Sequence, residues 1–112
     1  MGLPNLNRVL ALEAPEQVAD GAGGFSETWT VLGTLWAEVK PRTGRDRERE
    51  AVGAARVDYR ITVRALPVGE AARPMPGQRF RDGVRLFRIV AVADQDAAGR
   101  YLTCFAREEV AA

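Results

Sequence analysis

The chain has 112 residues, with 46% hydrophobic and 28% charged positions, which suits one ordinary globular domain. Its net charge of +1 gives no overall field that would draw it onto nucleic acid or acidic lipid. Histidine is absent, and the single cysteine cannot form an internal disulfide.

Catalysis is not expected, because Ser26 and Cys104 have no histidine that could act as their base. We predict instead that Cys104 is a buried small apolar residue. No catalytic residue, metal, cofactor or small-molecule substrate is predicted. The N-terminal stretch lacks the features of a signal peptide, and no apolar run has the length of a membrane span.

Short apolar runs separated by turn-forming residues predict an all-β fold, a small six-stranded barrel or sandwich formed by residues 1–112 as one domain. The first strand is expected over Arg8–Glu13, closed by Pro15. A turn region follows over Glu16–Gly24. Its glycines, Gly21, Gly23 and Gly24, are expected to take the positive φ that other residues resist.

The second strand is expected over Phe25–Lys40, with a bulge or bend at Gly33. Trp29 shares the side-chain parity of Phe25, whereas Trp36 points to the opposite face. Pairing should end at Pro41, which has no N–H to donate. We predict a set of structural anchors around this strand: Trp29, Trp36, Pro41, Gly23 and Gly24.

A long projecting loop is predicted over about residues 41–56, between the second and third strands. Its charges alternate in sign at each step from Arg45 to Glu50. As a helix, this run would form i,i+3 ion pairs; as a strand, it would separate arginines from acids; as a loop, it would be solvated. A loop of this length in a small domain is usually functional or disordered.

The third strand is expected over Val57–Ala65, where apolar and polar residues alternate. After a proline- and glycine-rich connection, an Asp82-Gly83 turn predicts a hairpin whose second strand spans Val84–Val92. Ile89–Val92 is apolar on both faces, which predicts burial on both sides or a subunit contact. The last strand is expected over Tyr101–Ala106 or slightly beyond. Strand edges and the Phe80–Val92 hairpin are the expected subunit contacts.

A nucleic-acid-binding barrel of the OB type is an alternative, because arginines on several strands could track phosphates. Against it, these arginines are balanced by acids, and Tyr59, Phe80 and Phe87 fall at core positions. The arginines concerned are Arg60, Arg64, Arg79, Arg81, Arg85 and Arg88.

An ordered set of short motifs resembles the phage head–tail joining family, the head-completion, stopper or head–tail adaptor proteins of tailed phages and gene transfer agents. The motifs are Asn7-Arg8-Val9, Asp20–Gly24, Trp29, Leu35–Gly44, Tyr59–Arg64, Arg79-Phe80, Phe87-Arg88-Ile89 and Arg100-Tyr101-Leu102.

The resemblance implies a structural β-barrel protein that forms a homo-oligomeric ring of 6 or 12 copies below the portal or adaptor ring. Its other partners would be tail-terminator or tail proteins and packaged double-stranded DNA, with no membrane. It would belong to a virion or phage-like particle assembled in the bacterial cytoplasm. The alternative within this class is a tail-terminator-like ring protein.

The resemblance also implies that the loop between the second and third strands closes the DNA channel after packaging. Mixed charges suit such a loop, since arginines of one copy can pair with acids of the next in a ring. The predicted gating residues are Arg42, Arg45, Asp46, Arg47, Glu48, Arg49 and Glu50.

Overall fold

The computed structural model describes residues 3–42 and 57–109, and in this part of the chain the fold is all-β. Among these residues no helix has the length and apolar character that a bilayer crossing requires. The prediction of an all-β, six-stranded fold is confirmed. The strands are β1 (Arg8–Ala19), β2 (Phe25–Pro41), β3 (Asp58–Arg64), β4 (Arg79–Asp82), β5 (Arg85–Asp94) and β6 (Tyr101–Glu109).

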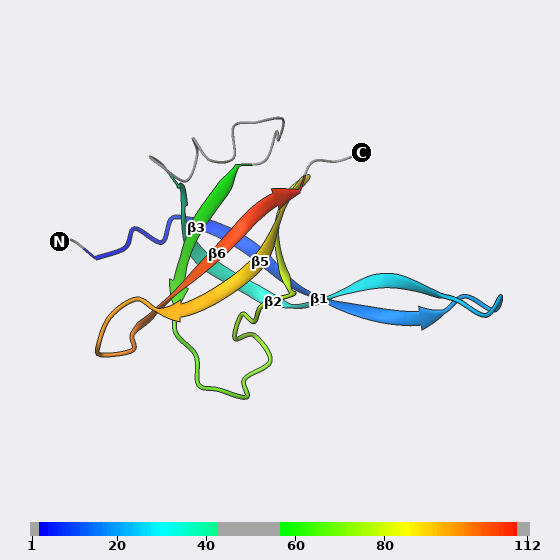
Figure 1. The fold of residues 1–112 in the computed structure, drawn as a ribbon. Coiled ribbons are helices and arrows are strands. Elements are labelled where there is room, and N and C mark those ends of the chain that lie inside the picture. Colours follow the sequence, from blue (N-terminus) through cyan, green and yellow to red (C-terminus); the bar gives the residue numbers. More distant parts are fainter. Residues whose placement is uncertain (1–2, 43–56, 110–112) are drawn as a thin grey trace.

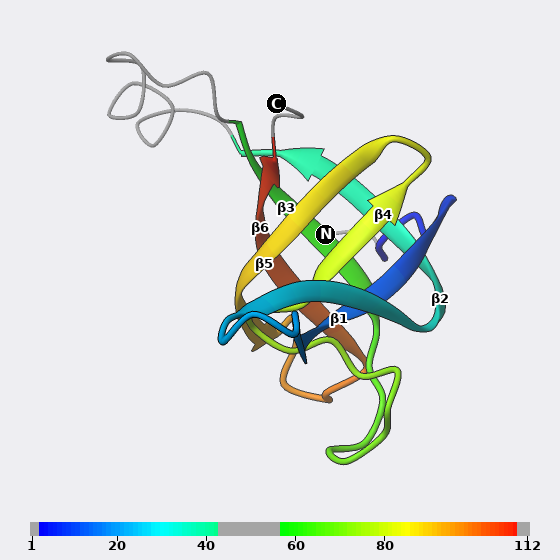
Figure 2. The ribbon, with the colours of Figure 1, turned by 90° about the vertical axis from the view of Figure 1, so that its right-hand side faces the viewer.

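The six strands form one closed antiparallel barrel in the order β1-β2-β3-β6-β5-β4 (Figures 1 and 2). β4 closes it by pairing with β1 over a short seam, in which Leu12 lies opposite Phe80 and Glu13 opposite Arg79. A closed barrel has no free sheet edge where its strands pair. Because β4 is short, however, β5 beyond Arg88 has no paired strand on that side among the described residues, so the predicted use of strand edges as subunit contacts stays a prediction.

Alternating side chains of the strands fill the interior, because successive residues of a strand point to opposite faces. Phe80 and Phe87 are the largest fully buried side chains. Cys104 is also fully buried, as predicted, and burial raises the pKa of its thiol to about 12. The other members of this core are Leu10, Leu12, Ala37, Ile61, Val63, Ile89, Leu102 and Ala106.

The hairpin of β1 and β2 extends well beyond the barrel, which corrects the predicted end of the first strand at Pro15 (Figure 1). We call its outer part, residues 14–30, the arm. Pro15 lies opposite Trp29 within this two-stranded ribbon. Each arm strand has a neighbour on one side only, so a proline nitrogen can face solvent without removing a ladder hydrogen bond.

The tip of the arm is a glycine turn in which Gly21 and Gly23 take φ values of 80° and 83°, as predicted. Gly24 does not have positive φ, so the prediction is wrong for that residue. A Cβ at Gly24 would lie 2.8 Å from the Asp20 carboxylate. That carboxylate accepts hydrogen bonds from the N–H groups of Ala22 and Gly24, which lower the pKa of Asp20.

Two bulges bend the sheet. In β2 the extra residue is Leu32, next to Gly33, where a bulge or bend was predicted. In β5 the extra residue is Val90, which is 48% exposed. The apolar run around Val90 is therefore not buried on both faces within the subunit, and its alternative, a subunit contact, stays a prediction.

The remaining boundaries differ little from those expected. The β4–β5 turn is formed by Gly83 and Val84, one residue later than predicted, because Asp82 pairs with Arg85. Gly83 has a φ of 62°, which a two-residue hairpin turn with glycine in first position requires. β6 continues to Glu109. Thr62 is one of the alternating polar residues of β3, yet its side chain is buried.

Candidate assembly surfaces

The chain leaves β2 and returns to β3 at one end of the barrel. The Arg42 N–H donates to the Asp58 carbonyl oxygen at 2.9 Å, so the two chain ends that flank residues 43–56 lie side by side. The buried Asp58 side chain lies between two arginines, with Oδ2 3.9 Å from Arg42 and Oδ1 3.4 Å from Arg107. These contacts link Arg42, which precedes residues 43–56, to Asp58 at the start of β3, which follows them.

Of the predicted gating residues, Arg42 is the one that falls within the described part of the chain. It is partly buried, and its guanidinium lies 5.5 Å from the centre of the Phe105 ring. The others lie outside the described residues, as does most of the predicted projecting loop: Arg45, Asp46, Arg47, Glu48, Arg49 and Glu50.

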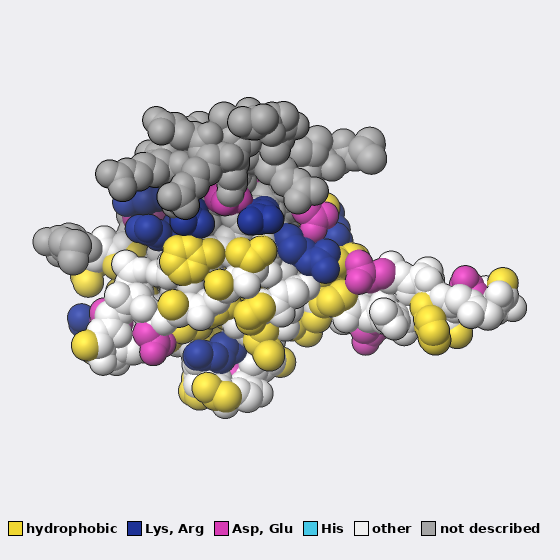
Figure 3. Space-filling model, viewed as in Figure 1, with side chains coloured by type: hydrophobic (Ala, Val, Ile, Leu, Met, Phe, Trp, Pro, Cys, Tyr) yellow, Lys and Arg dark blue, Asp and Glu magenta, His cyan; other side chains and the backbone are white. Residues whose placement is uncertain are grey.

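A basic outer face adjoins Arg42 on the barrel. Lys40, Arg60 and Phe105 lie in one row across β2, β3 and β6, and Arg64 lies opposite Tyr101 in a parallel row. The guanidinium of Arg60 stacks 5.9 Å from the Phe105 ring, and that of Arg64 lies 5.7 Å from the Tyr101 ring. In Figure 3, hydrophobic side chains gather over this side of the barrel with Lys and Arg along their border. We call this surface the basic face.

A second polar cluster ties β5 to β3 and β6. Arg85 donates to both carboxylate oxygens of Glu108, at 2.8 and 3.1 Å, and to the Tyr59 hydroxyl at 3.0 Å. These hydrogen bonds lower the pKa of Glu108 and raise that of Arg85. The Tyr59 ring meets the buried Phe87 ring edge-on at 5.1 Å, so the cluster rests on the core. Its role is to hold strands together.

A third cluster lies where the arm leaves the barrel. The Glu13 carboxylate, 5% exposed, accepts hydrogen bonds from Arg79 at 2.7 Å and Arg81 at 2.8 Å. Burial opposes the charge of Glu13, but these bonds outweigh it and lower its pKa. The Trp29 ring is stacked by Arg79 at 4.0 Å and lies 5.0 Å from Arg88. Together these contacts fix the direction of the arm.

The predicted anchors occupy different surroundings. Trp29 belongs to the cluster at the arm root, and Pro41 is the last residue of β2, as predicted. Trp36 points away from the core, as its parity predicts, and is 59% exposed. Gly23 and Gly24 lie in the arm turn.

The arginines of the OB-type alternative do not form a continuous stripe. Arg79 and Arg81 share Glu13, while Arg85 and Arg88 pair with Glu108 and Glu109. The remaining two, Arg60 and Arg64, lie on the basic face. Over residues 3–42 and 57–109 no group of three or more acidic or cysteine side chains is placed to hold a metal ion.

Sequence reasoning missed the arm and the burial of Glu13. One feature of the sequence points to both. Between Arg8 and Lys40 the chain has no basic residue at all, yet it carries five acids: Glu13, Glu16, Asp20, Glu27 and Glu38. An acid on an otherwise apolar run, such as Glu13 after Val9–Leu12, needs a buried basic partner from another strand.

The fold and its surfaces define a small closed β-barrel with a projecting hairpin and charged outer faces. The family model for phage head completion protein matches residues 1–109, so the chain belongs to that family. A search of the curated proteins found no match.

Two solved structures resemble the chain along nearly all of its length. One belongs to the virion of a native gene transfer agent particle. It is 52% identical, has a TM-score of 0.79, and the match covers 98% of this chain and 100% of that one. The other is the solution structure of protein SF1141 from Shigella flexneri 2a, with 24% identity, a TM-score of 0.68 and 96% coverage of both chains. At that identity it supports the fold alone.

Proposed function

We propose that this protein is a structural head–tail connector of a phage-like particle and is incorporated into the virion at the head–tail junction. The observation that carries this is the 52% identity, over 98% of the chain, to a protein of a gene transfer agent virion. Membership of the head completion family agrees with it. The role requires assembly with other head and tail proteins and no catalysis.

We further propose that copies form a ring below the portal or adaptor, and that residues 43–56 of each copy close the DNA channel after packaging. Support comes from the barrel end where this segment begins and returns, at Arg42 and Asp58. Basic side chains surround that end, namely Arg42, Arg107, Arg60 and Lys40. Arginines so placed suit contact with the phosphates of a retained DNA end.

Deletion of residues 44–54 tests the closure. The barrel should keep its β-sheet circular dichroism and its unfolding transition, because its strands and core lie outside the deletion. Particles built with the shortened protein should incorporate it and lose their DNA, measured as nuclease-protected genome per particle. A Gly/Ser segment of the original length is the matched control, which separates the effect of length from that of charge.

The outcomes separate the parts of the proposal. Particles that retain protected DNA at the normal level would contradict the closure while leaving the connector role intact. A full-length protein that is absent from purified particles would contradict the connector role itself. Salt-sensitive binding of single-stranded DNA by the isolated monomer would favour the OB-type alternative.

A further inference from the structure

We infer that the arm of one copy docks on the basic face of the next copy. Each subunit would then contact one neighbour through its arm and the other neighbour through its basic face. This inference rests on the proposed function, in which copies assemble side by side. It names the two surfaces that would meet. Both lie within the described residues, and the loop at 43–56 takes no part.

The charge of the arm selects its class of partner. The arm carries Glu16, Asp20 and Glu27 and no basic residue. Three acids without a compensating cation are repelled by DNA phosphates, so the arm is not a DNA-binding element. A positively charged protein surface is the complementary partner.

One face of the arm carries apolar side chains on either side of a central polar pair, Gln17 and Glu27. By the pairing register, Ala19 lies opposite Phe25, Gln17 opposite Glu27 and Pro15 opposite Trp29, which places these residues on the same side of the ribbon. Phe25 near the tip is 69% exposed, and Val31, the residue of β2 that follows the arm, is 57% exposed. Large exposed aromatic side chains beside a charge are typical anchors of protein–protein contacts.

A free two-stranded ribbon is marginally stable in water. In the arm both outer edges are unpaired, and six residue pairs, Ala14–Thr30 to Ala19–Phe25, extend past the barrel. At about 3.3 Å per residue the arm is therefore about 20 Å long. Contact with a partner would cover Phe25 and stabilise the ribbon along this length.

The basic face has the matching character. Arg60 and Arg64 supply positive charge, as does Lys40, which lies 3.7 Å from Glu38, while the partly exposed Phe105 supplies aromatic surface. The bulged Val90, in the strand beside Phe105, adds exposed apolar area. An acidic, Phe-bearing hairpin complements this surface in both charge and apolarity.

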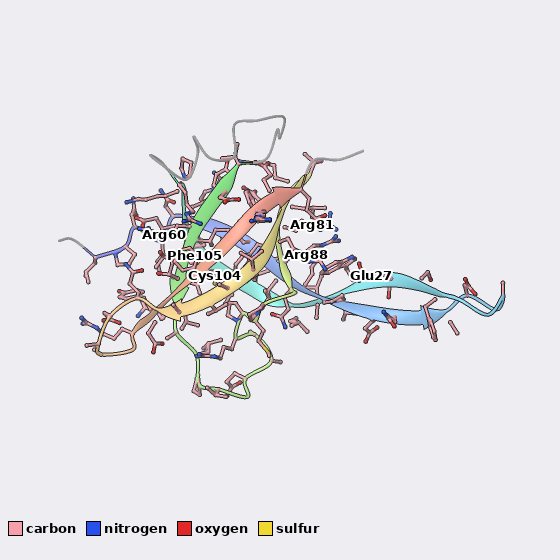
Figure 4. All side chains as sticks on the ribbon, in the orientation of Figure 1. Glu27, Arg60, Arg81, Arg88, Cys104 and Phe105 are labelled. Atoms are coloured by element: carbon pink, nitrogen blue, oxygen red, sulfur yellow. The ribbon has the colours of Figure 1, made fainter. Side chains whose placement is uncertain are left out.

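The arm cannot contact the basic face of its own subunit. Figure 4 shows Arg60 and Phe105 on the barrel and Glu27 on the arm, which points away from them. The contacts of Glu13 and Trp29 with Arg79 hold the arm in that direction. The two surfaces can therefore meet only between copies, as a heterologous contact. A heterologous contact whose rotation closes generates a ring, as the proposed function requires.

Cysteine cross-linking in assembled particles tests the contact. Ala19→Cys places a thiol beside Phe25, and Ala91→Cys places one beside Phe105, and both substitutions leave the charges and aromatic side chains intact. The native Cys104 is buried with a pKa of about 12, so it should not react. With a flexible bis-maleimide, the double variant should form a ladder of covalent oligomers. Mixed single variants should stop at dimers, and each single variant alone should give none.

Three results would overturn the inference: a double variant present in particles without any ladder, dimers from Ala19→Cys alone, or capture of a different particle protein by Ala19→Cys. In each case the chain is in the particle, so the connector role survives. Absence of the chain from particles would instead contradict the proposed function.

A charge exchange provides an independent test. Glu27→Arg alone and Arg60→Glu alone should each reduce the cross-linked ladder by at least about tenfold, because like charges then face each other. The two together should restore it. The matched control is Glu70→Arg, the same change at an exposed acid outside both surfaces, which should leave the ladder unchanged. Failure of the combined variant to recover, in protein that still folds, would contradict the pairing.

Discussion

Glu13 is the residue on which the junction of barrel and arm depends. Its buried carboxylate is the shared partner of Arg79 and Arg81, and Arg79 in turn stacks on Trp29. Removal of one partner from a buried ion pair leaves an uncompensated charge, which costs far more than an exposed pair is worth. The acid is therefore required by the two arginines that surround it.

We predict that Glu13→Ala lowers the free energy of unfolding by about 3 kcal/mol, because Arg79 remains buried without its carboxylate. Urea denaturation followed by tryptophan fluorescence measures this. Glu16→Ala, three residues along on the exposed part of β1, is the control and should change the value by less than about 0.5 kcal/mol. Equal effects of the two variants would show that the Glu13 ion pairs carry no special weight.

Stability should also fall in acid. The pKa values of Glu13 and Glu108 are both lowered from 4.5 in the folded chain. A lowered pKa means that the folded state favours the carboxylate, so the stabilisation is complete above pH 4.5 and is lost as the pH falls through the folded pKa values. Denaturation midpoints measured from pH 7 to pH 2 should show this decline. The double variant Glu13→Gln, Glu108→Gln should be less stable at pH 7 and should lose less on acidification.

At the scale of elements, sequence patterns located five strands because each has alternating or continuous apolar residues bounded by turns. The short β4, in which Phe80 is the one apolar residue, was indicated by the Asp82-Gly83 hairpin signal. The arm was missed for a physical reason. Proline is expected to end a strand that has neighbours on both sides. In the two-stranded arm, however, the outer edge of the strand that contains Pro15 faces solvent, so the strand continues past it. The number of neighbours that a strand has is a tertiary property, so residue preferences alone could not reveal it.

The arm should be held in place by Trp29 and not by Trp36. Trp29 is partly buried between Arg79 and Arg88, whereas Trp36 is 59% exposed on the barrel. We expect Trp29→Ala to speed amide hydrogen exchange across Ala14–Ala19 and Phe25–Thr30 by about tenfold or more, since cation–π contacts of this kind contribute about 1–2 kcal/mol. Trp36→Ala is the matched control and should leave exchange in the arm unchanged. Equal protection of the arm amides in both variants would show that Trp29 does not hold the arm in place.

At the scale of the whole molecule, the sequence could not predict that the barrel closes or which charged side chains form ion pairs. Nothing in the local pattern of β1 and β4 shows that these strands meet, since they are separated by about sixty residues and pair at only three positions. The same pairing brings Glu13 to Arg79, so the arm-root cluster could not be foreseen without the closure. By contrast, the burial of Cys104 followed from its apolar neighbours, and that of Phe80 and Phe87 from their side-chain parity.

Closure makes the seam between β1 and β4 a decisive part of the core. Leu12 is fully buried there, opposite the fully buried Phe80. Leu12→Ala should lower the free energy of unfolding by about 3 kcal/mol, through lost apolar burial and the cavity left behind. Val9→Ala, on the same strand but 49% exposed, should cost less than about 1 kcal/mol. Because a closed barrel shares one core, exchange protection in Leu12→Ala should fall together in β3, β5 and β6 and not in β1 alone. A loss confined to β1 and the arm would mean that the remaining strands hold together without the seam.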